Sequence, residues 1–257
     1  MKNIIALLIF GGLFCLPAYA SGARLSDEDL EKKKEGWYPT GLPLANFSTD
    51  AGFGYGLRVF GYNNGFRSDP HFDEAPYFMQ LYGQFFQTTG GQAYHKLDLD
   101  MPYAWGSEYR FRATLEYAAV LSANYFGLGA ADSDAGLTDA AGATYDNWGA
   151  YDDFLSSGTG TESFRKYNNY QRRKFYGLLR ASRPILDWLD VEVGLEFGYA
   201  GITDWSGESF EYGGEDLVAA PTRLSEDRAN LTGDEGGWVN YLHLGLKLDE
   251  RDFEPNP

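Results

Sequence analysis

The chain has 257 residues, 44% of them hydrophobic and 17% aromatic, and its 21 Lys and Arg against 37 Asp and Glu give a formal net charge of −16. This acidity argues against nucleic acid as a partner, because phosphate binding requires a basic surface. The single cysteine, Cys15, excludes a disulfide framework and a cysteine-based metal site. The chain contains 32 Gly, 19 Tyr and 18 Phe. This content of aromatic residues is too high for a disordered chain, and the combination is typical of transmembrane β-barrels.

Residues 1–20 are predicted to be a secretory signal peptide. Lys2 provides the positive start, residues 4–16 the apolar run, and Ala18 and Ala20 the small residues before the cleavage site. The apolar run is too short to span a bilayer as a helix, which requires about 20 residues. We therefore expect cleavage after Ala20 and export from the cytoplasm.

Residues 21–40 are predicted to form a charged periplasmic stub. Ser26 is placed to cap a short surface helix within residues 26–34. No later segment contains 18 consecutive apolar residues, so the sequence predicts no transmembrane helix.

From Gly41 onward the sequence alternates between polar and apolar residues. In residues 109–121, for example, Tyr, Phe, Ala and Leu alternate with Arg110, Arg112, Thr114 and Glu116. Alternation over nine or more residues exceeds the mean soluble strand of about five or six residues and matches the roughly 9–11 that a tilted strand needs to cross hydrocarbon. Eight strands are predicted: 42–50, 52–62, 76–87, 93–101, 109–121, 170–182, 190–199 and 238–249.

The connections between these strands differ in length according to their side of the sheet. Residues 102–107 and 183–187 form short turns, whereas residues 127–165 and 201–236 form long loops rich in Gly, Asp and Ser. Short turns on one side and long loops on the other are typical of bacterial outer-membrane barrels, and a soluble β-sandwich would have shorter strands. The predicted fold is all-β, an antiparallel transmembrane β-barrel over residues 41–257 in the bacterial outer membrane, in contact with lipid and lipopolysaccharide.

The polar faces of the predicted strands carry charges of both signs. A charge-selective channel would favour one sign, so we predict that these groups pair across neighbouring strands and keep the channel as the alternative. The charged residues are Arg58, Lys96, Asp98, Asp100, Arg110, Arg112, Glu116, Lys174, Arg180, Asp190, Glu192, Glu196 and Lys247.

Catalytic and metal sites have little support in the sequence. Of the three histidines, His71, His95 and His243, only His243 lies on a polar face, where it would need a nucleophile and an orienting group. No Gly-x-Ser-x-Gly, His-Glu-x-x-His or P-loop motif is present. The acidic side chains of the long loops offer oxygen ligands for Ca²⁺ or Mg²⁺ but fit no EF-hand or Gly-Asp nonapeptide. We predict solvated loops, no metal or other cofactor, no catalytic residue and no enzymatic activity.

Three segments resemble the BamA/TamA-type outer-membrane barrel superfamily, also called the bacterial surface antigen family. Residues 41–56, GLPLANFSTDAGFGYG, resemble the opening hairpin of that barrel. A second segment resembles its recurrent Tyr-Phe-Gly-Ile-Gly turn through Tyr125, Phe126, Gly127 and Gly129. Residues 245–257 resemble its Gly-x-x-x-Asp-Thr-Arg-Asp segment through Asp249, Arg251 and Asp252, with Glu250 in place of the usual Thr.

This resemblance implies a role in outer-membrane protein insertion or translocation, with other outer-membrane or periplasmic proteins as partners. The family's barrel has sixteen strands and its Asp-Arg-Asp segment lies near the middle. The resemblance therefore implies the N-terminal half of such a barrel, an incomplete form without POTRA domains and without the family's Arg-Gly-Phe loop, which leaves its own activity in question. The alternative is a self-contained barrel of eight strands that serves surface binding or passive permeation.

Overall fold

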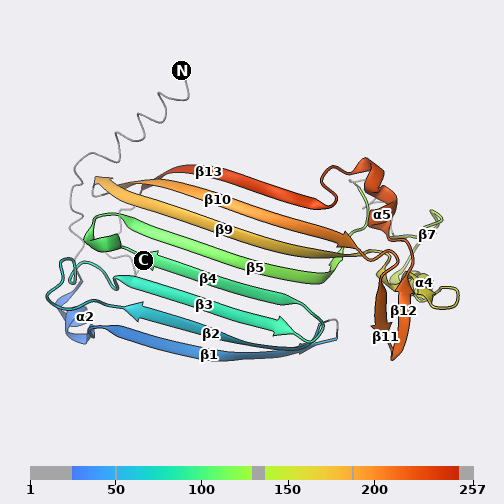
Figure 1. Ribbon diagram of the computed structural model, residues 1–257, viewed down its shortest axis with the longest axis horizontal. Coiled ribbons are helices and arrows are strands. Elements are labelled where there is room, and N and C mark those ends of the chain that lie inside the picture. Colours follow the sequence, from blue (N-terminus) through green and yellow to red (C-terminus); the bar gives the residue numbers. More distant parts are fainter. Residues whose placement is uncertain (1–24, 50, 129–136, 187, 249–257) are drawn as a thin grey trace, which may run out of the picture.

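The molecule is built on one curved antiparallel sheet with a smaller folded unit at one end (Figure 1). The computed structural model describes residues 25–49, 51–128, 137–186 and 188–248. Eight strands follow one another across the sheet in the order of the chain. They are β1 (Trp37–Ser48), β2 (Gly52–Asn63), β3 (Met79–Thr88), β4 (Ala93–Met101), β5 (Arg110–Asn124), β9 (Asn169–Leu186), β10 (Leu189–Asp204) and β13 (Gly236–Leu248).

All eight predicted strands are confirmed. Their observed limits differ from the predicted ones where strand pairing extends beyond the alternating sequence. Strand β4 has the predicted limits. Strand β1 begins at Trp37, inside the segment predicted as a stub, because residues 37–40 pair with the last residues of β2, from Phe60 to Asn63. Strands β9 and β10 span 18 and 16 residues, longer than predicted, since they pair with each other almost to the turn that joins them.

One end of the sheet carries the β2–β3, β4–β5 and β9–β10 connections and helix α2, and the other carries the tight β1–β2 and β3–β4 hairpins beside the two long connections. The turn between β4 and β5 contains the single-turn 3-10 helix η1 (Ala104–Gly106). Helix α2 (Asp27–Lys32) has Ser26 as its N-cap, which accepts a hydrogen bond from the Asp29 amide at 3.2 Å, as the sequence predicted. None of the helices in the described ranges is long and apolar enough to cross a membrane.

The opposite end carries a compact unit, here called the cap (residues 137–167 and 205–231), formed by the two long connections (Figure 1). Strand β8 of the first connection pairs in parallel with β12 of the second, through Glu162 with Val218 and Ser163 with Ala219. These residues are therefore folded rather than irregular loops, while acidic side chains such as Glu211, Glu215 and Asp216 remain exposed to solvent. The elements are β6 (Leu137–Thr138), β7 (Thr144–Tyr145), α4 (Trp148–Leu155), β8 (Glu162–Ser163), η2 (Phe164–Lys166), β11 (Ser209–Tyr212), β12 (Glu215–Ala219), α5 (Arg223–Asp227) and η3 (Arg228–Asn230).

The cap has a hydrophobic core of its own. Tyr151 and Tyr167 are almost fully buried, and Leu155 packs against them. Helix α4 presents Tyr151 and Leu155 one turn apart, so both reach the same side, and Asn147 caps its N-terminus by accepting from the Ala150 amide at 3.0 Å. Burial raises the pKa of Tyr151 to about 12. This core is formed within residues 137–167, and the second connection joins it through the β8–β12 pairing and a hydrogen bond from the Tyr167 hydroxyl to Glu226 at 2.8 Å.

Candidate functional site

The two faces of the sheet have the opposite burial to that of a soluble protein. Apolar side chains are widely exposed on one face, with Leu195 at 55% and Leu246 at 71%. The charged face is more enclosed, with side-chain exposures of 17% for Arg110 and 20% for Asp100. In a water-soluble sheet the apolar face is the one that packs on a core. Here the charged residues lie on the more enclosed face, called the inner face, and the exposed apolar side chains lie on the outer face.

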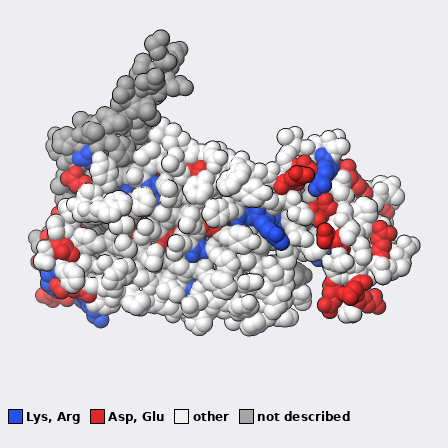
Figure 2. Space-filling view, in the orientation of Figure 1, with Lys and Arg blue, Asp and Glu red and all other residues white. Residues whose placement is uncertain are grey.

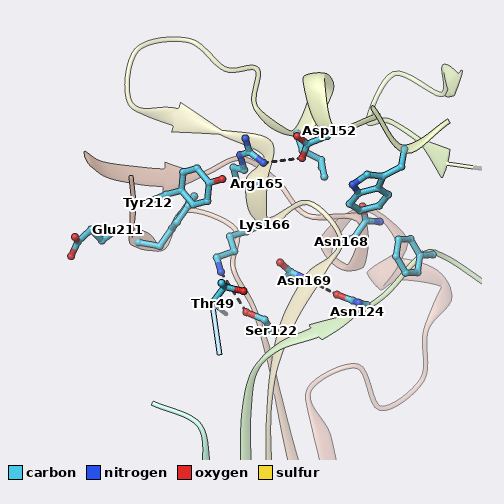
Figure 3. A pocket seen from close by; sticks show the side chains of 14 residues that line it. Thr49, Ser122, Asn124, Asp152, Arg165, Lys166, Asn168, Asn169, Glu211 and Tyr212 are labelled. Carbon is cyan, nitrogen blue, oxygen red and sulfur yellow. Dashed lines mark hydrogen bonds and ion pairs between the residues drawn. The ribbon is translucent and has the colours of Figure 1, made fainter. Parts of the chain in front are cut away.

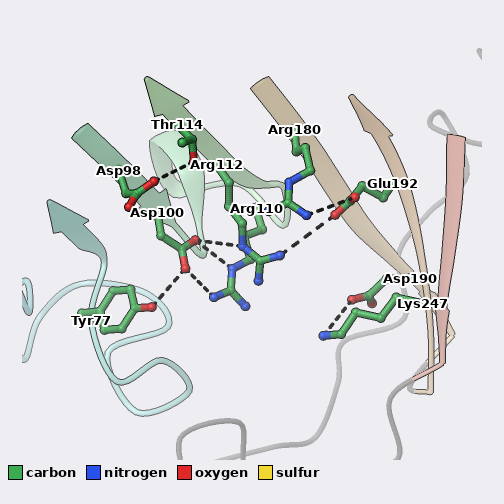
Figure 4. Close-up of polar contacts among 10 residues, drawn as sticks. All are labelled: Tyr77, Asp98, Asp100, Arg110, Arg112, Thr114, Arg180, Asp190, Glu192 and Lys247. Carbon is green, nitrogen blue, oxygen red and sulfur yellow. Dashed lines mark hydrogen bonds and ion pairs between the residues drawn. The ribbon is translucent and has the colours of Figure 1, made fainter. Parts of the chain in front are cut away.

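A cluster of charges centred on Asp100 lies on the inner face (Figure 4). Arg110 donates to Asp100 from Nε at 2.8 Å and from Nη2 at 2.5 Å, and Arg112 Nε lies 3.5 Å from the same carboxylate. The hydroxyl of Tyr77 donates to it at 3.0 Å. A carboxylate between two guanidinium groups and a phenol has its acceptor positions filled.

The inner-face contacts continue across the sheet from this cluster. Arg112 on β5 and Arg180 on β9 both approach Glu192 on β10, at 4.0 and 3.6 Å. The Arg180–Glu192 contact joins neighbouring strands, whereas Arg112 reaches Glu192 across β9. The predicted pairing of charges across neighbouring strands is confirmed by Arg180–Glu192, by Arg110–Asp100 and by Lys174–Glu116 at 3.8 Å, Lys247–Asp190 at 3.8 Å and His243–Glu196 at 2.7 Å. Lys96 and Asp98 pair along one strand, β4, at 2.9 Å.

The outer face carries a lateral row of aromatic side chains near the cap. Its members lie opposite one another on six consecutive strands, because each is the register partner of the next. The rings of Phe85 and His95 stack at 4.6 Å between centroids, and those of Tyr199 and Trp238 lie 5.2 Å apart. The row consists of Phe85, His95, Tyr117, Phe175, Tyr199 and Trp238.

Below this aromatic row the outer face is aliphatic, and it ends at exposed tryptophans. A second row of register partners is Leu81, Leu99, Ala113, Leu179, Leu195 and Leu242. At the end that carries helix α2, Trp37, Trp105 and Trp188 are 55%, 81% and 48% exposed. Figure 2 shows acidic side chains gathered at the end that carries α5, β11 and β12, whereas the body of the sheet in this view is largely uncharged.

Both edge strands of the sheet have one unpaired side within the described residues. Strand β1 pairs with β2 and strand β13 pairs with β10, and neither has a second partner among the strands that the structure describes. The two edges are rich in exposed apolar side chains, among them Leu42, Phe47, Leu244 and Leu248. Unpaired backbone groups beside apolar side chains make each edge a template for another strand.

The family-motif residues fall partly within the described chain. Tyr125 donates its hydroxyl to Asp227 at 3.1 Å and its backbone oxygen accepts from Asn168, which ties the end of β5 to α5 and β9. Phe126 is exposed, and Gly127 has a φ of 113°, which favours glycine. The other predicted residues, Gly129, Asp249, Arg251, Asp252 and the cleavage-site residues Ala18 and Ala20, lie outside the described residues.

The three histidines have separate surroundings. His71 Nδ1 lies 2.6 Å from Glu74 and its ring stacks on Tyr103, while His95 belongs to the outer aromatic row. His243 contacts the Glu196 carboxylate. No group of three His, Cys, Asp or Glu side chains within the described ranges is placed to hold a metal ion.

Sequence reasoning missed the cap. The signal for the cap was present in residues 147–155, where an Asn N-cap precedes Trp148, Tyr151 and Leu155 at helical spacing. The pairing of β8 with β12 had no such signal, because it joins two-residue and five-residue strands from different connections.

The comparisons with known proteins match only the beginning of the chain. Residues 19–78 match a family model described as a domain of unknown function, DUF5982. This segment covers the start of the described chain, helix α2 and strands β1 and β2. No curated protein and no solved structure matches the chain.

Proposed function

We propose that this chain forms the wall of a β-barrel in a bacterial outer membrane. The observation that carries the proposal is the inverted sheet, with a charged, internally paired inner face and an exposed apolar outer face. Only helices and closed barrels satisfy every backbone group in hydrocarbon, so a curved sheet with an apolar exterior fits the barrel solution. The outer aromatic row and the exposed tryptophans at the opposite end resemble the two aromatic girdles that flank the apolar band of such barrels.

The two ends of the sheet then have different surroundings. Outer-membrane barrels place short turns in the periplasm and long connections outside the cell. The cap, which is formed by the two longest connections, would accordingly face the exterior, next to lipopolysaccharide, and the end that carries helix α2 would face the periplasm.

The unpaired edges of β1 and β13 support a role in insertion or translocation rather than passive permeation. Each unsatisfied backbone group in lipid costs several kcal/mol, so both edges require strands that the described residues do not provide. These strands can belong to the rest of a larger barrel of the BamA/TamA type or to a client that pairs by strand addition. Paired charges of both signs on the inner face give no support to a charge-selective channel.

The membrane placement is tested by fluorescence quenching along β10. In a Cys15→Ser background, single cysteines at residues 193–197 are labelled with an environment-sensitive dye, and the protein is folded into vesicles that contain nitroxide-labelled lipid. We expect strong quenching at residues 193, 195 and 197 and weak quenching at residues 194 and 196. Quenching without this alternation would contradict the proposal.

The role of the edges is tested separately by photo-crosslinking in cells. A photoreactive amino acid at Ala45 on β1 or Leu246 on β13 is expected to form adducts with other outer-membrane strands, because these outer-face positions border the unpaired edges. Leu99, at the centre of the sheet on β4, is the matched control and is expected to form none. Equal adducts at all three positions would contradict an open seam.

A further inference from the structure

A cavity of about 450 Å³ lies between the cap and the adjacent end of the sheet (Figure 3). It is assembled from five separate parts of the chain: the β1–β2 turn, the end of β5, helix α4, the start of β9 and strand β11. Small-molecule sites are usually concave and of about 300–1,000 Å³. The cavity therefore has the size of a small-molecule site.

Side-chain amides and a hydroxyl provide hydrogen-bonding groups at the centre of this cavity. Asn169 Nδ2 donates to Asn124 Oδ1 at 2.8 Å, which leaves the Asn124 amide hydrogens as donors and the Asn169 carbonyl oxygen as an acceptor. Lys166 Nζ lies 3.5 Å from Ser122 Oγ and 4.7 Å from the centre of the Trp205 ring. These contacts hold the ammonium group in place beside the two amides.

Aromatic rings line the cavity beside these polar groups. Trp148 is 59% exposed, Tyr212 51% and Phe126 49%. All three rings are therefore accessible to a ligand in the cavity. An aromatic face offers a flat apolar surface, which suits the C–H face of a pyranose ring, while amides and an ammonium group suit its hydroxyls.

The charges around the cavity favour an uncharged ligand. Arg165 is held by Asp152 at 2.9 Å and lies over the Tyr212 ring at 4.6 Å, so its charge is already paired. The lining holds two cationic side chains, Arg165 and Lys166, and two acidic ones, Asp152 and Glu211, and acidic side chains dominate this end of the molecule (Figure 2). A net negative field repels anions.

We propose that this cavity binds a neutral saccharide of one or two pyranose rings. Trp148 and Phe126 would stack on the ring faces, and Asn124, Asn169 and Lys166 would hydrogen-bond the hydroxyls. A free oligosaccharide and the neutral sugars of lipopolysaccharide share this chemistry. The proposal goes beyond the membrane role proposed above and stands on the cavity alone.

The test uses the full chain, refolded in a detergent without sugar groups. Binding is measured first on an array of neutral and acidic glycans and then by titration calorimetry, with neutral hexose oligosaccharides in one arm and purified lipopolysaccharide core oligosaccharide in the other. We expect binding of neutral glycans, and the two arms tell which source is preferred. Binding of no glycan, or of acidic glycans only, would overturn the proposal.

Variants assign the binding to this cavity. Trp148→Ala and Asn124→Ala change residues on different elements. Each is expected to raise the dissociation constant about tenfold, because one stacked ring or one hydrogen-bonding group is lost. Trp105→Ala is the matched control, because Trp105 is exposed at the other end of the sheet, and it is expected to bind like the unchanged protein. Protease resistance of the cap verifies folding of each variant. Unchanged binding in both cavity variants would also overturn the proposal.

Discussion

Arg110 and Asp100 form a two-pronged ion pair between neighbouring strands, with Nε to Oδ1 at 2.8 Å and Nη2 to Oδ2 at 2.5 Å. Both side chains are more than three-quarters enclosed, at 17% and 20% exposure. Arg112 shares the same carboxylate and continues to Glu192 on β10. The inner face of β4, β5 and β10 is therefore linked by alternating charges that depend on one another.

Removal of Asp100 is predicted to destabilise the sheet strongly. In Asp100→Ala, Arg110 and Arg112 lose their shared partner and repel each other. We expect the free energy of unfolding to fall by about 2–4 kcal/mol, near the range for breaking a buried pair. Urea titration followed by tryptophan fluorescence measures the change.

The control is Glu28→Ala, which removes an exposed ion pair with Lys32. The two side chains are 78% and 70% exposed, so the loss of this pair should lower the free energy of unfolding by less than about 1 kcal/mol. Equal losses in the two variants would show that the Asp100 cluster is no more important than a surface pair.

An arginine on the outer face is predicted to lower the free energy of unfolding by an amount that depends on its position along the strand. Leu195 lies in the aliphatic row, whereas Tyr199 lies in the aromatic row on the same strand. In lipid vesicles, Leu195→Arg should lower the free energy of unfolding by about 2–4 kcal/mol and Tyr199→Arg by no more than about 1 kcal/mol. The same urea titration in vesicles measures both. A larger loss of stability in Tyr199→Arg than in Leu195→Arg would contradict the prediction that the aliphatic row lies at the centre of the hydrocarbon layer.

The pKa of Lys33 is predicted to be about 8, well below the usual value for lysine. Its ammonium group donates to the carbonyls of Phe72 and Ala75 at 2.5 and 2.7 Å. Desolvation by burial lowers the pKa of Lys33 from 10.5 to about 8, and nearby Asp73 opposes the change. The unfolded chain therefore binds more protons between pH 8 and pH 10.5, so the contribution of Lys33 to stability rises with pH across this window.

NMR of the ¹³C-methylated lysines measures this pKa directly. We expect one resonance with a midpoint near pH 8, and its loss in Lys33→Arg assigns it. Asp73→Asn should lower the midpoint further, because it removes the charge that favours the protonated form. A midpoint above pH 10 in the folded protein would refute the desolvation of Lys33.

Truncation of Tyr151 is predicted to unfold the cap and leave the sheet intact. Tyr151→Ala removes the central side chain of the cap core, a change that typically costs about 3–5 kcal/mol for a large aromatic residue. Because that core has no part in the strand pairing of the sheet, we expect new protease cleavage within residues 137–167 and unchanged protection of β3, β4 and β5. Leu128→Ala, an exposed position beside the cap, should leave the cleavage pattern as it was. Loss of protection in the whole sheet would show that the cap and the sheet fold as one unit.

The sheet was largely predictable from the sequence because its information is local. Each strand has a period of two over nine or more residues, so the side chains of Arg110, Arg112 and Glu116 are assigned to one face without any tertiary structure. The mixture of signs on that face also predicted that the charges pair. The partners themselves were not predictable, since Arg112 reaches Glu192 across β9 and this depends on curvature.

Apart from helix α4, the cap and its cavity were decided by tertiary structure. Residues 127–165 and 201–236 have no sustained period, and their strands are too short to be recognised. Their order comes from burial of Tyr151 and Tyr167 and from the pairing of β8 with β12, contacts between residues far apart in the chain.

The sequence by itself determined the eight strands, the charged face of most of them and the positions of the two longest connections, because alternation and turn chemistry are properties of neighbouring residues. Only the tertiary structure brought Asn124, Trp148 and Asn169 around one cavity and placed β1 and β13 at the edges of the sheet that the structure describes. Both features depend on how the curved sheet and the folded loops meet, and that is set by packing between distant segments rather than by any local pattern.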